Sequence, residues 1–333
     1  MSETIRWGVL GPGRIADNVA GDFDNVPGGE LRAVGSRSLD RARAFADKHG
    51  IPNTHGSYAD LIADPEVDAL YIATPHPQHL QLALAGIAAG KPLLVEKSLT
   101  ATVAGAEQLI AAARAAGVFA MEAMWTRFQP MWVKARELIA DGALGEVRQV
   151  SADLGVDRPF DPTARLFDPA QGGGALLDVG VYPVSLAQWL LGTPDAVHTS
   201  GRQAPTGVDE QAALLFSYED GRAALLQASI AYPLPGGARV VGDQGRLDVL
   251  PRFHHPTDMV LTRRDGSTEE FHLPSRGVGY AHEFDEVHRC LAEGLTESPV
   301  MPLADTLTVL RLLEEASGQL GVVHHEDETV LPG

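Results

Sequence analysis

The sequence predicts an α/β protein of two domains. Residues 1–124 are expected to form a doubly wound parallel sheet, and residues 125–333 an α+β domain with a mainly antiparallel sheet. The chain has 333 residues, which is long for a single hydrophobic core. In its first part, short apolar runs alternate with longer amphipathic runs, which is typical of strand–helix units. Later segments alternate apolar and polar residues between short turns, which indicates half-buried strands.

The strands of the first domain are continuous apolar runs, as expected where helices cover both faces of a parallel sheet. The predicted strands are 5–10, 31–36, 68–75, 92–97 and 118–124. The predicted helices are 15–26, 38–50, 79–90 and 102–117.

The second domain is expected to begin with a helix over 132–145 and a strand over 146–156, and to close with a helix over 304–321. Between these, turns such as EDG, GDQG and RDG separate strand-like runs. Those runs are 212–218, 223–232, 246–250 and 258–264. The segment GGGALLDVGVYPV (172–184) carries Asp178 and Tyr182 four residues apart in an apolar run, so a helix would place both on one face.

Composition and charge argue against several kinds of partner and site. The formal net charge is -18 and no basic stripe is present, so we expect neither a nucleic-acid nor a membrane-surface partner. Cys290 is the only cysteine, which excludes an intrachain disulfide and a cysteine-based metal site. We find no run of 18 apolar residues, and the N-terminal apolar run is too short for a signal peptide. A cytoplasmic setting is the expectation.

Histidines occur as two adjacent pairs, His254 with His255 and His324 with His325. Neighbours in a chain rarely both reach one ion, and no carboxylate spacing supports a zinc site. We therefore interpret them as surface residues and expect no metal.

A glycine loop follows the first strand directly. Gly11, Gly13 and Ala16 match the pattern G-x-G-x-x-G/A between a strand and a helix. The first glycine allows a tight turn, the second allows close approach of a pyrophosphate, and the helix N-terminus supplies N–H groups. A dinucleotide is the predicted ligand. The alternatives are the nucleoside of a methyl donor, or a turn without a ligand.

The end of the second strand favours NADP over NAD. An NAD site usually places an acid there, but this chain has Ser36-Arg37-Ser38, with Arg41 four residues after Arg37. Guanidinium groups and hydroxyls suit a 2′-phosphate, and Arg14 adds positive charge beside the glycines. The alternative is that these arginines are only solvated surface residues.

Lys97 ends the strand over 92–97, at the edge of the sheet where ligands bind in doubly wound folds. A free tyrosine has a pKa of about 10, and a nearby ammonium lowers it. We therefore predict that Tyr182 exchanges a substrate proton, that Lys97 tunes it, and that Asp178 orients the substrate or the lysine. The alternative for Lys97 is a surface lysine.

Several motifs then carry a family resemblance across nearly the whole chain. GPGRIA, ATPHPQHL, AGKPLLVEKS and GGGALLDVGVYPV, in this order, resemble the glucose–fructose oxidoreductase, inositol dehydrogenase and rhizopine-catabolism (Gfo/Idh/MocA-type) family. SRSLDRARAFADKHGIP, HPQH, MEAMWTRFQP and ESPVMPL are closest to its branch of dimeric dihydrodiol dehydrogenases and NADP-dependent D-xylose dehydrogenases.

The resemblance implies a Rossmann domain followed by a large open-faced sheet, with Lys97, Asp178 and Tyr182 as the catalytic residues. It places His76 beside the nicotinamide and Trp125 in the wall of the substrate pocket, the alternative for Trp125 being inter-domain packing. Ser98 stands where the family typically has proline. The expected cofactor contacts are Gly11, Gly13, Arg14, Ile15, Ser36, Arg37, Ser38, Arg41, Thr74, His76, His79, Glu96, Lys97, Trp125 and Arg165.

The function expected from these observations is hydride transfer between NADP and a CH–OH carbon of an aldose such as D-xylose, or of a vicinal trans-dihydrodiol. A homodimer through the sheet of the second domain is the expected assembly. Two alternatives remain: a non-catalytic NADP-binding regulator, and a redox-neutral enzyme that processes a glycoside with a retained cofactor.

Overall fold

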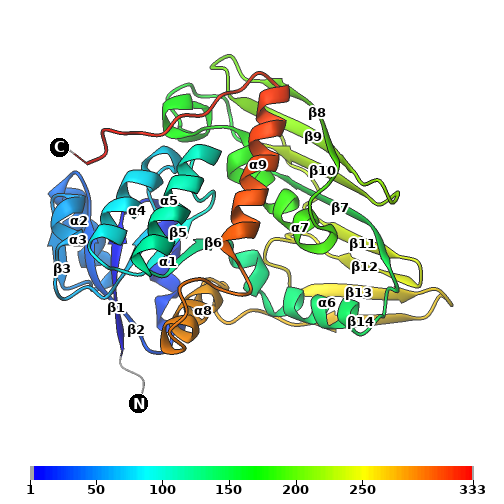
Figure 1. Cartoon of the computed structure of the whole chain (residues 1–333), viewed down its shortest axis with the longest axis horizontal. Coiled ribbons are helices and arrows are strands. Elements are labelled where there is room, and N and C mark those ends of the chain that lie inside the picture. Colours follow the sequence, from blue (N-terminus) through cyan, green and yellow to red (C-terminus); the bar gives the residue numbers. More distant parts are fainter. Residues whose placement is uncertain (1–3, 332–333) are drawn as a thin grey trace. The chain divides into compact units, whose positions relative to one another are not determined.

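The computed structural model describes residues 4–331, and this part of the chain divides into two compact units (Figure 1). The second unit comprises Trp125–Ser275 and Ala304–His324. The first comprises the described residues up to Met124, together with Arg276–Leu303 and the segment from His325 onward. The expected second domain, 125–333, is therefore shared between the two units.

Within the described residues, the first unit holds a six-stranded parallel sheet in the order β3-β2-β1-β4-β5-β6. The strands are β1 (Ile5–Leu10), β2 (Gly29–Gly35), β3 (Asn53–His55), β4 (Ala69–Ile72), β5 (Leu93–Glu96) and β6 (Ala120–Ala123). The helices are α1 (Arg14–Asp22), α2 (Leu39–His49), α3 (Tyr58–Ile62), α4 (His79–Ala88), α5 (Val103–Ala116) and α8 (Ala281–Ala292). Every residue of β4, β5 and β6 is buried, which confirms the expectation from their apolar runs.

Strand order reverses between β1 and β4, and ligands bind at such a switch point in open parallel sheets. Figure 1 shows α4 and α5 packed beside this sheet. The expected helix over 15–26 ends at Asp22, where a 3₁₀ turn, Phe23–Asn25, continues the chain.

Helix α8 was not predicted from the sequence, although its aromatic residue completes the core of the first unit. Phe284 packs edge-on against Trp7, Phe23 and Tyr71, with ring centroids 4.8, 5.1 and 5.6 Å away. These contacts explain why Arg276–Leu303 folds with the first unit.

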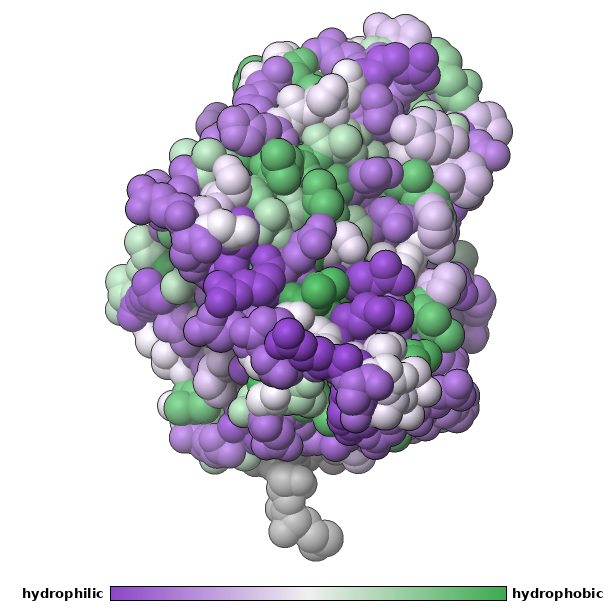
Figure 2. Space-filling view, turned by 90° about the vertical axis from the view of Figure 1, so that its right-hand side faces the viewer, coloured by the Kyte–Doolittle hydropathy of each residue, from purple (hydrophilic) through white to green (hydrophobic). Residues whose placement is uncertain are grey.

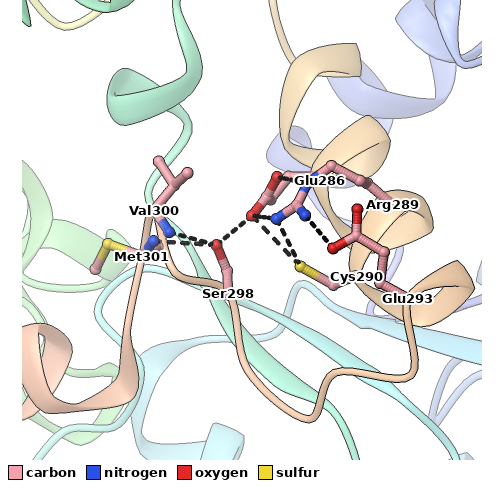
Figure 3. Close-up of polar contacts among 7 residues, drawn as sticks. All are labelled: Glu286, Arg289, Cys290, Glu293, Ser298, Val300 and Met301. Atoms are coloured by element: carbon pink, nitrogen blue, oxygen red, sulfur yellow. Dashed lines mark hydrogen bonds and ion pairs between the residues drawn. The ribbon is translucent and has the colours of Figure 1, made fainter.

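Figure 3 shows how α8 is tied to the ESPVMPL segment. The Glu286 carboxylate accepts hydrogen bonds from Ser298 and Arg289, and the Cys290 Sγ lies 3.4 Å from it. The Ser298 hydroxyl in turn accepts from the backbone N–H groups of Val300 and Met301, at 3.0 and 3.1 Å. Burial and the Glu286 charge raise the pKa of Cys290 to about 12, so this thiol stays protonated and acts as a packing residue.

Among the described residues, the second unit holds an eight-stranded sheet in the order β14-β13-β12-β11-β7-β10-β9-β8. Its strands are β7 (Val147–Gly155), β8 (Ala196–Gln203), β9 (Asp209–Ser217), β10 (Ala223–Ser229), β11 (Ala238–Gly242), β12 (Gly245–Val249), β13 (Asp258–Arg263) and β14 (Thr268–His272). Its helices are α6 (Pro130–Ala140), α7 (Val181–Leu191) and α9 (Leu303–Gln319). The pairing is antiparallel except between β7 and β10, which confirms the prediction of a mainly antiparallel sheet.

Helices α6, α7 and α9 lie on one face of this sheet, and no described helix of the unit covers the other (Figure 1). Strand register places one row of side chains across the uncovered face. In order from β8 to β14 the row is His198, Leu215, Leu225, Ser151, Arg239, Asp248, Val260 and Glu270. Leu215 and Leu225, directly opposite each other, are 40% and 48% exposed. Figure 2 shows a hydrophobic group on this side, bordered by hydrophilic residues.

Within residues 4–331, one stretch, Pro169–Leu191, has the length and composition of a possible membrane span. It is 23 residues long, and its backbone is helical except at residues 172–174. However, 83% of its apolar window is buried inside the fold, as in the core helix of a globular unit. Its middle, Leu176–Gly180, is a π-helical turn that leads into α7.

Candidate active site in two halves

The glycine loop has the geometry that a dinucleotide requires. Gly11 has φ +92°, and a Cβ there would lie 2.8 Å from Thr74 Cγ2, so a side chain is excluded by both backbone and packing. A Cβ at Gly13 would meet only Ala73 O, at 3.9 Å. The fold itself therefore leaves room for a side chain here, and the expected reason for the second glycine is close approach of a ligand. Gly13 precedes α1, whose first N–H groups are available to a phosphate.

The predicted NADP residues lie at the end of β2. Arg37 and Arg41 are exposed, and the charges of both act on Tyr58. Within residues 4–331, neither is held in an ion pair with a carboxylate. The Ser36 Oγ accepts from Ser38 N at 3.2 Å, while the Ser38 Oγ accepts from Arg41 N at 3.4 Å and caps α2. Arg14 is exposed and Ile15 is half-buried at the start of α1.

His79 has a different environment from the one expected for a cofactor contact. Its ring is 0% exposed, with Nε2 2.7 Å from Thr74 O and Nδ1 3.0 Å from Ser98 O. Burial lowers the pKa of His79 to about 4, so the ring is neutral near pH 7. The ring thus joins the loops after β4 and β5, and a contact between His79 and the cofactor stays a prediction.

The loop after β5 carries Lys97, which is half-buried. Glu96 orients its backbone, because Oε2 accepts from Lys97 N at 3.2 Å while Oε1 accepts from the Tyr71 hydroxyl at 2.6 Å. His76 Nε2 lies 3.1 Å from Lys97 O, so these two predicted residues do come together. The Lys97–Ser98 peptide is cis, at the position where the family typically has proline.

A buried acid beside this loop was missed by the sequence reasoning. Glu283 of α8 is 1% exposed, and burial together with the Glu96 charge raises its pKa well above the ordinary range. The protonated form is therefore favoured. The acid stands in an amphipathic run, AHEFDEVHRC, that carries no motif, so the sequence held no signal for it.

The second half of the site begins at the π-helical turn. The Asp178 carboxylate accepts from Arg165 at 2.7 Å, and its side chain is 16% exposed. Arg165 was expected to contact the cofactor, but here it holds Asp178. An arginine thirteen residues earlier in a loop gives no sequence signal for that pairing.

Tyr182 stands on the first turn of α7 and is 8% exposed. The Trp125 Nε1 donates to its phenol oxygen at 3.1 Å. His254 lies 5.2 Å from the Tyr182 ring, and His255 stacks on the Trp125 indole with centroids 5.1 Å apart. The expectation that His254 and His255 are surface residues was therefore wrong, because both are half-buried against this aromatic pair.

The start of this helical stretch is held by a strand residue that was also missed. Asp209 of β9 is 0% exposed, and its Oδ2 accepts from Leu176 N at 2.6 Å. Burial raises the pKa of Asp209 to about 7. A Cβ on Gly174, which has φ +125°, would collide with the Asp209 carboxylate, so this glycine of the GGG run is needed for the cap.

Lys97 belongs to the first unit, and Asp178 and Tyr182 to the second, so their cooperation stays a prediction. Among residues 4–331, no group of three or more His, Cys, Asp or Glu side chains is placed to hold a metal ion.

Comparison with known proteins identifies the family of this chain. The family model described as an oxidoreductase family with an NAD-binding Rossmann fold matches residues 5–124, and the GFO/IDH/MocA C-terminal domain matches 132–248. Trans-1,2-dihydrobenzene-1,2-diol dehydrogenase of Mus musculus is 37% identical, over 97% of this chain and 99% of that protein. The chain belongs to the GFO/IDH/MocA oxidoreductase family. The Homo sapiens protein of the same description is 36% identical, with the same coverage.

Two solved structures share the fold over nearly the whole chain. Aldose-aldose oxidoreductase from Caulobacter crescentus, complexed with glycerol, matches with a TM-score of 0.86 and 26% identity over 96% of this chain and 98% of that one. KijD10, a 3-ketoreductase from Actinomadura kijaniata in complex with NADP and TDP-benzene, matches with a TM-score of 0.83 and 27% identity over 98% and 100%. The expected family and fold are thus confirmed, and the chain is an oxidoreductase with an NAD(P)-binding Rossmann domain.

Proposed function

We propose that this oxidoreductase transfers a hydride between NADP and a CH–OH carbon of an aldose or a vicinal trans-dihydrodiol. The observation that carries the proposal is the position of Lys97. Gly11, Thr74 and Lys97 follow β1, β4 and β5, which are neighbours in the sheet, so the lysine stands at the edge where a dinucleotide binds. The diol dehydrogenase relatives and the aldose oxidoreductase neighbour support the two substrate classes.

The reaction is assigned to residues of both units. When bound, NADP accepts the hydride. Tyr182 takes the proton of the substrate hydroxyl, and the Lys97 ammonium stabilises the phenolate that does so. Asp178, held by Arg165, orients the substrate hydroxyl. An aldose would yield a lactone, and a cyclic dihydrodiol a ketone that tautomerises to a catechol.

NADP is the proposed cofactor because positive groups gather where a 2′-phosphate would lie. Arg37 and Arg41 are exposed near Tyr58, and the end of β2 offers the Ser36 hydroxyl in place of an acid. A structural neighbour bound to NADP supports the same choice.

We also propose a homodimer through the uncovered face of the eight-stranded sheet, in a reducing, cytoplasmic setting. An exposed apolar pair on β9 and β10, with the ion pair Arg239–Asp248 on β11 and β12 of the same face, suits a two-fold interface.

The test is a panel of aldoses and vicinal trans-diols offered with NADP and with NAD, followed by the absorbance of the reduced cofactor. We expect at least one class to reduce NADP, faster than NAD. A protein that binds NADPH but oxidises no member of the panel would contradict the proposal and favour a regulator. Cofactor absorbance in the purified protein, with turnover of a glycoside and no net reduction, would favour the redox-neutral alternative.

A further inference from the structure

The contact between Trp125 and Tyr182 carries an inference about how the phenol is activated. An indole N–H donates and never accepts, so in the 3.1 Å contact the phenol oxygen is the acceptor. Both side chains belong to the second unit and are 6% and 8% exposed. A donor aimed at a phenol oxygen favours the charged form of that oxygen, and it does so more strongly where water is scarce.

We propose that Trp125 is a positioning residue whose indole N–H orients the Tyr182 phenol and stabilises its phenolate. The inference rests on the proposed function of Tyr182 as the proton-exchanging group. The Trp125 N–H is then a second group, besides Lys97, that stabilises the phenolate. It belongs to the same unit as the phenol.

The indole is held firmly enough for this role. His255 stacks on it at an interplanar angle of 28°, and Gln129 Nε2 donates to Trp125 O at 3.0 Å. Hydrogen bonds from side chains of the 3₁₀ turn and of α6 hold the loop that carries the histidines. Thr126 Oγ1 donates to His254 O at 2.8 Å, and Trp132 Nε1 donates to Phe253 O at 2.7 Å. These are the contacts by which the loop holds the donor in place.

The other titratable and charged groups around the pair are few. The inward-facing residues of β7 and β10, the strands packed against α7, are apolar. The π-helical turn contributes Asp178, paired with Arg165. The 3₁₀ turn contributes Arg127, paired with Asp305 at 2.6 Å. The loop contributes Arg252, His254 and His255, and burial lowers the pKa of His255 to about 4, so its ring adds no charge near pH 7.

The experiment is an NMR titration of the full chain labelled with [¹³Cζ]tyrosine, without substrate or cofactor. The chain has 6 tyrosines, so the signals are few, and Tyr182→Phe assigns the relevant one. In Trp125→Phe we expect the pKa of Tyr182 to rise by about one unit, as for loss of one hydrogen bond to a charged acceptor. Trp132→Phe is the matched control, because it removes an indole N–H bonded to the same loop.

Equal titration of Tyr182 in the wild type and in folded Trp125→Phe, including none in either up to about pH 11, would overturn the inference. The same shift in Trp132→Phe would also overturn it, because the effect would then come from the loop and not from the donor. A shift of the Tyr182 signal without a matching shift in the pH dependence of kcat/KM would leave the inference standing. That result would instead contradict the proposed function of Tyr182.

Discussion

At the scale of single residues, cofactor choice depends on the guanidinium groups after β2. A charge-assisted hydrogen bond contributes about 1.5–3 kcal/mol, so losing one and adding a negative charge should weaken NADP binding at least tenfold. We expect Arg37→Asp to raise the KM for NADP by at least about this factor and to leave the KM for NAD nearly unchanged. Arg43→Asp is the control, because Arg43 is exposed on α2, the helix that follows Arg37, and is not among the expected cofactor contacts. An unaltered NADP/NAD preference in Arg37→Asp would refute the assignment.

Some residues of the candidate site could be predicted from the sequence, and others could not. Gly11 was predictable, because the constraint on it is local: a positive φ directly after a strand. Arg165 and His254 were not, because their roles arise from contacts with Asp178 and Tyr182 that only the folded unit creates. His79 was found through a family motif, but its complete burial and its contacts with two backbone carbonyls could not be predicted from that motif.

At the scale of elements, the outer face of the eight-stranded sheet provides the next test. Leu215 and Leu225 face each other across β9 and β10. A charge placed there would be buried in a two-fold interface at a cost of several kcal/mol. We expect the wild type to sediment as a dimer, and Leu225→Asp as a monomer at micromolar concentration. Val323→Asp, at a residue 69% exposed outside the sheet, should remain dimeric. A monomeric wild type would contradict the proposed interface.

Helices and strands whose apolar residues recur with a clear period were predictable from the sequence, and those without such a period were not. The apolar runs of β1, β4 and β5 and the capped helices α2 and α5 stand close to their expected bounds. The short pieces β3 and α3, the polar strands β8 and β14, and α8 were missed, because their apolar residues are few or belong to contacts distant in sequence. The π-helical turn before α7 has no sequence signature, although it carries Asp178.

At the scale of the whole molecule, the expected functional residues are divided between the two units. The first holds the glycine loop, the arginines and Lys97, and the second holds Asp178, Trp125 and Tyr182. A change in the phenol should therefore affect the chemical step and leave cofactor binding intact. The boundary near Met124 was predictable, because continuous apolar runs give way after it to runs that alternate apolar and polar residues. The return of 276–303 to the first unit was not visible, because it depends on the packing of Phe284.

The most direct test of this account is one comparison on Tyr182→Phe: turnover, and the Kd for NADPH, measured on the same preparation. Proton transfer by a positioned group contributes about 10²–10⁴-fold, so we expect turnover to fall by that factor while NADPH binds as in the wild type. Tyr232→Phe, which removes a hydroxyl from an exposed tyrosine of the same unit, should change neither quantity. Near-normal turnover of Tyr182→Phe would contradict the account.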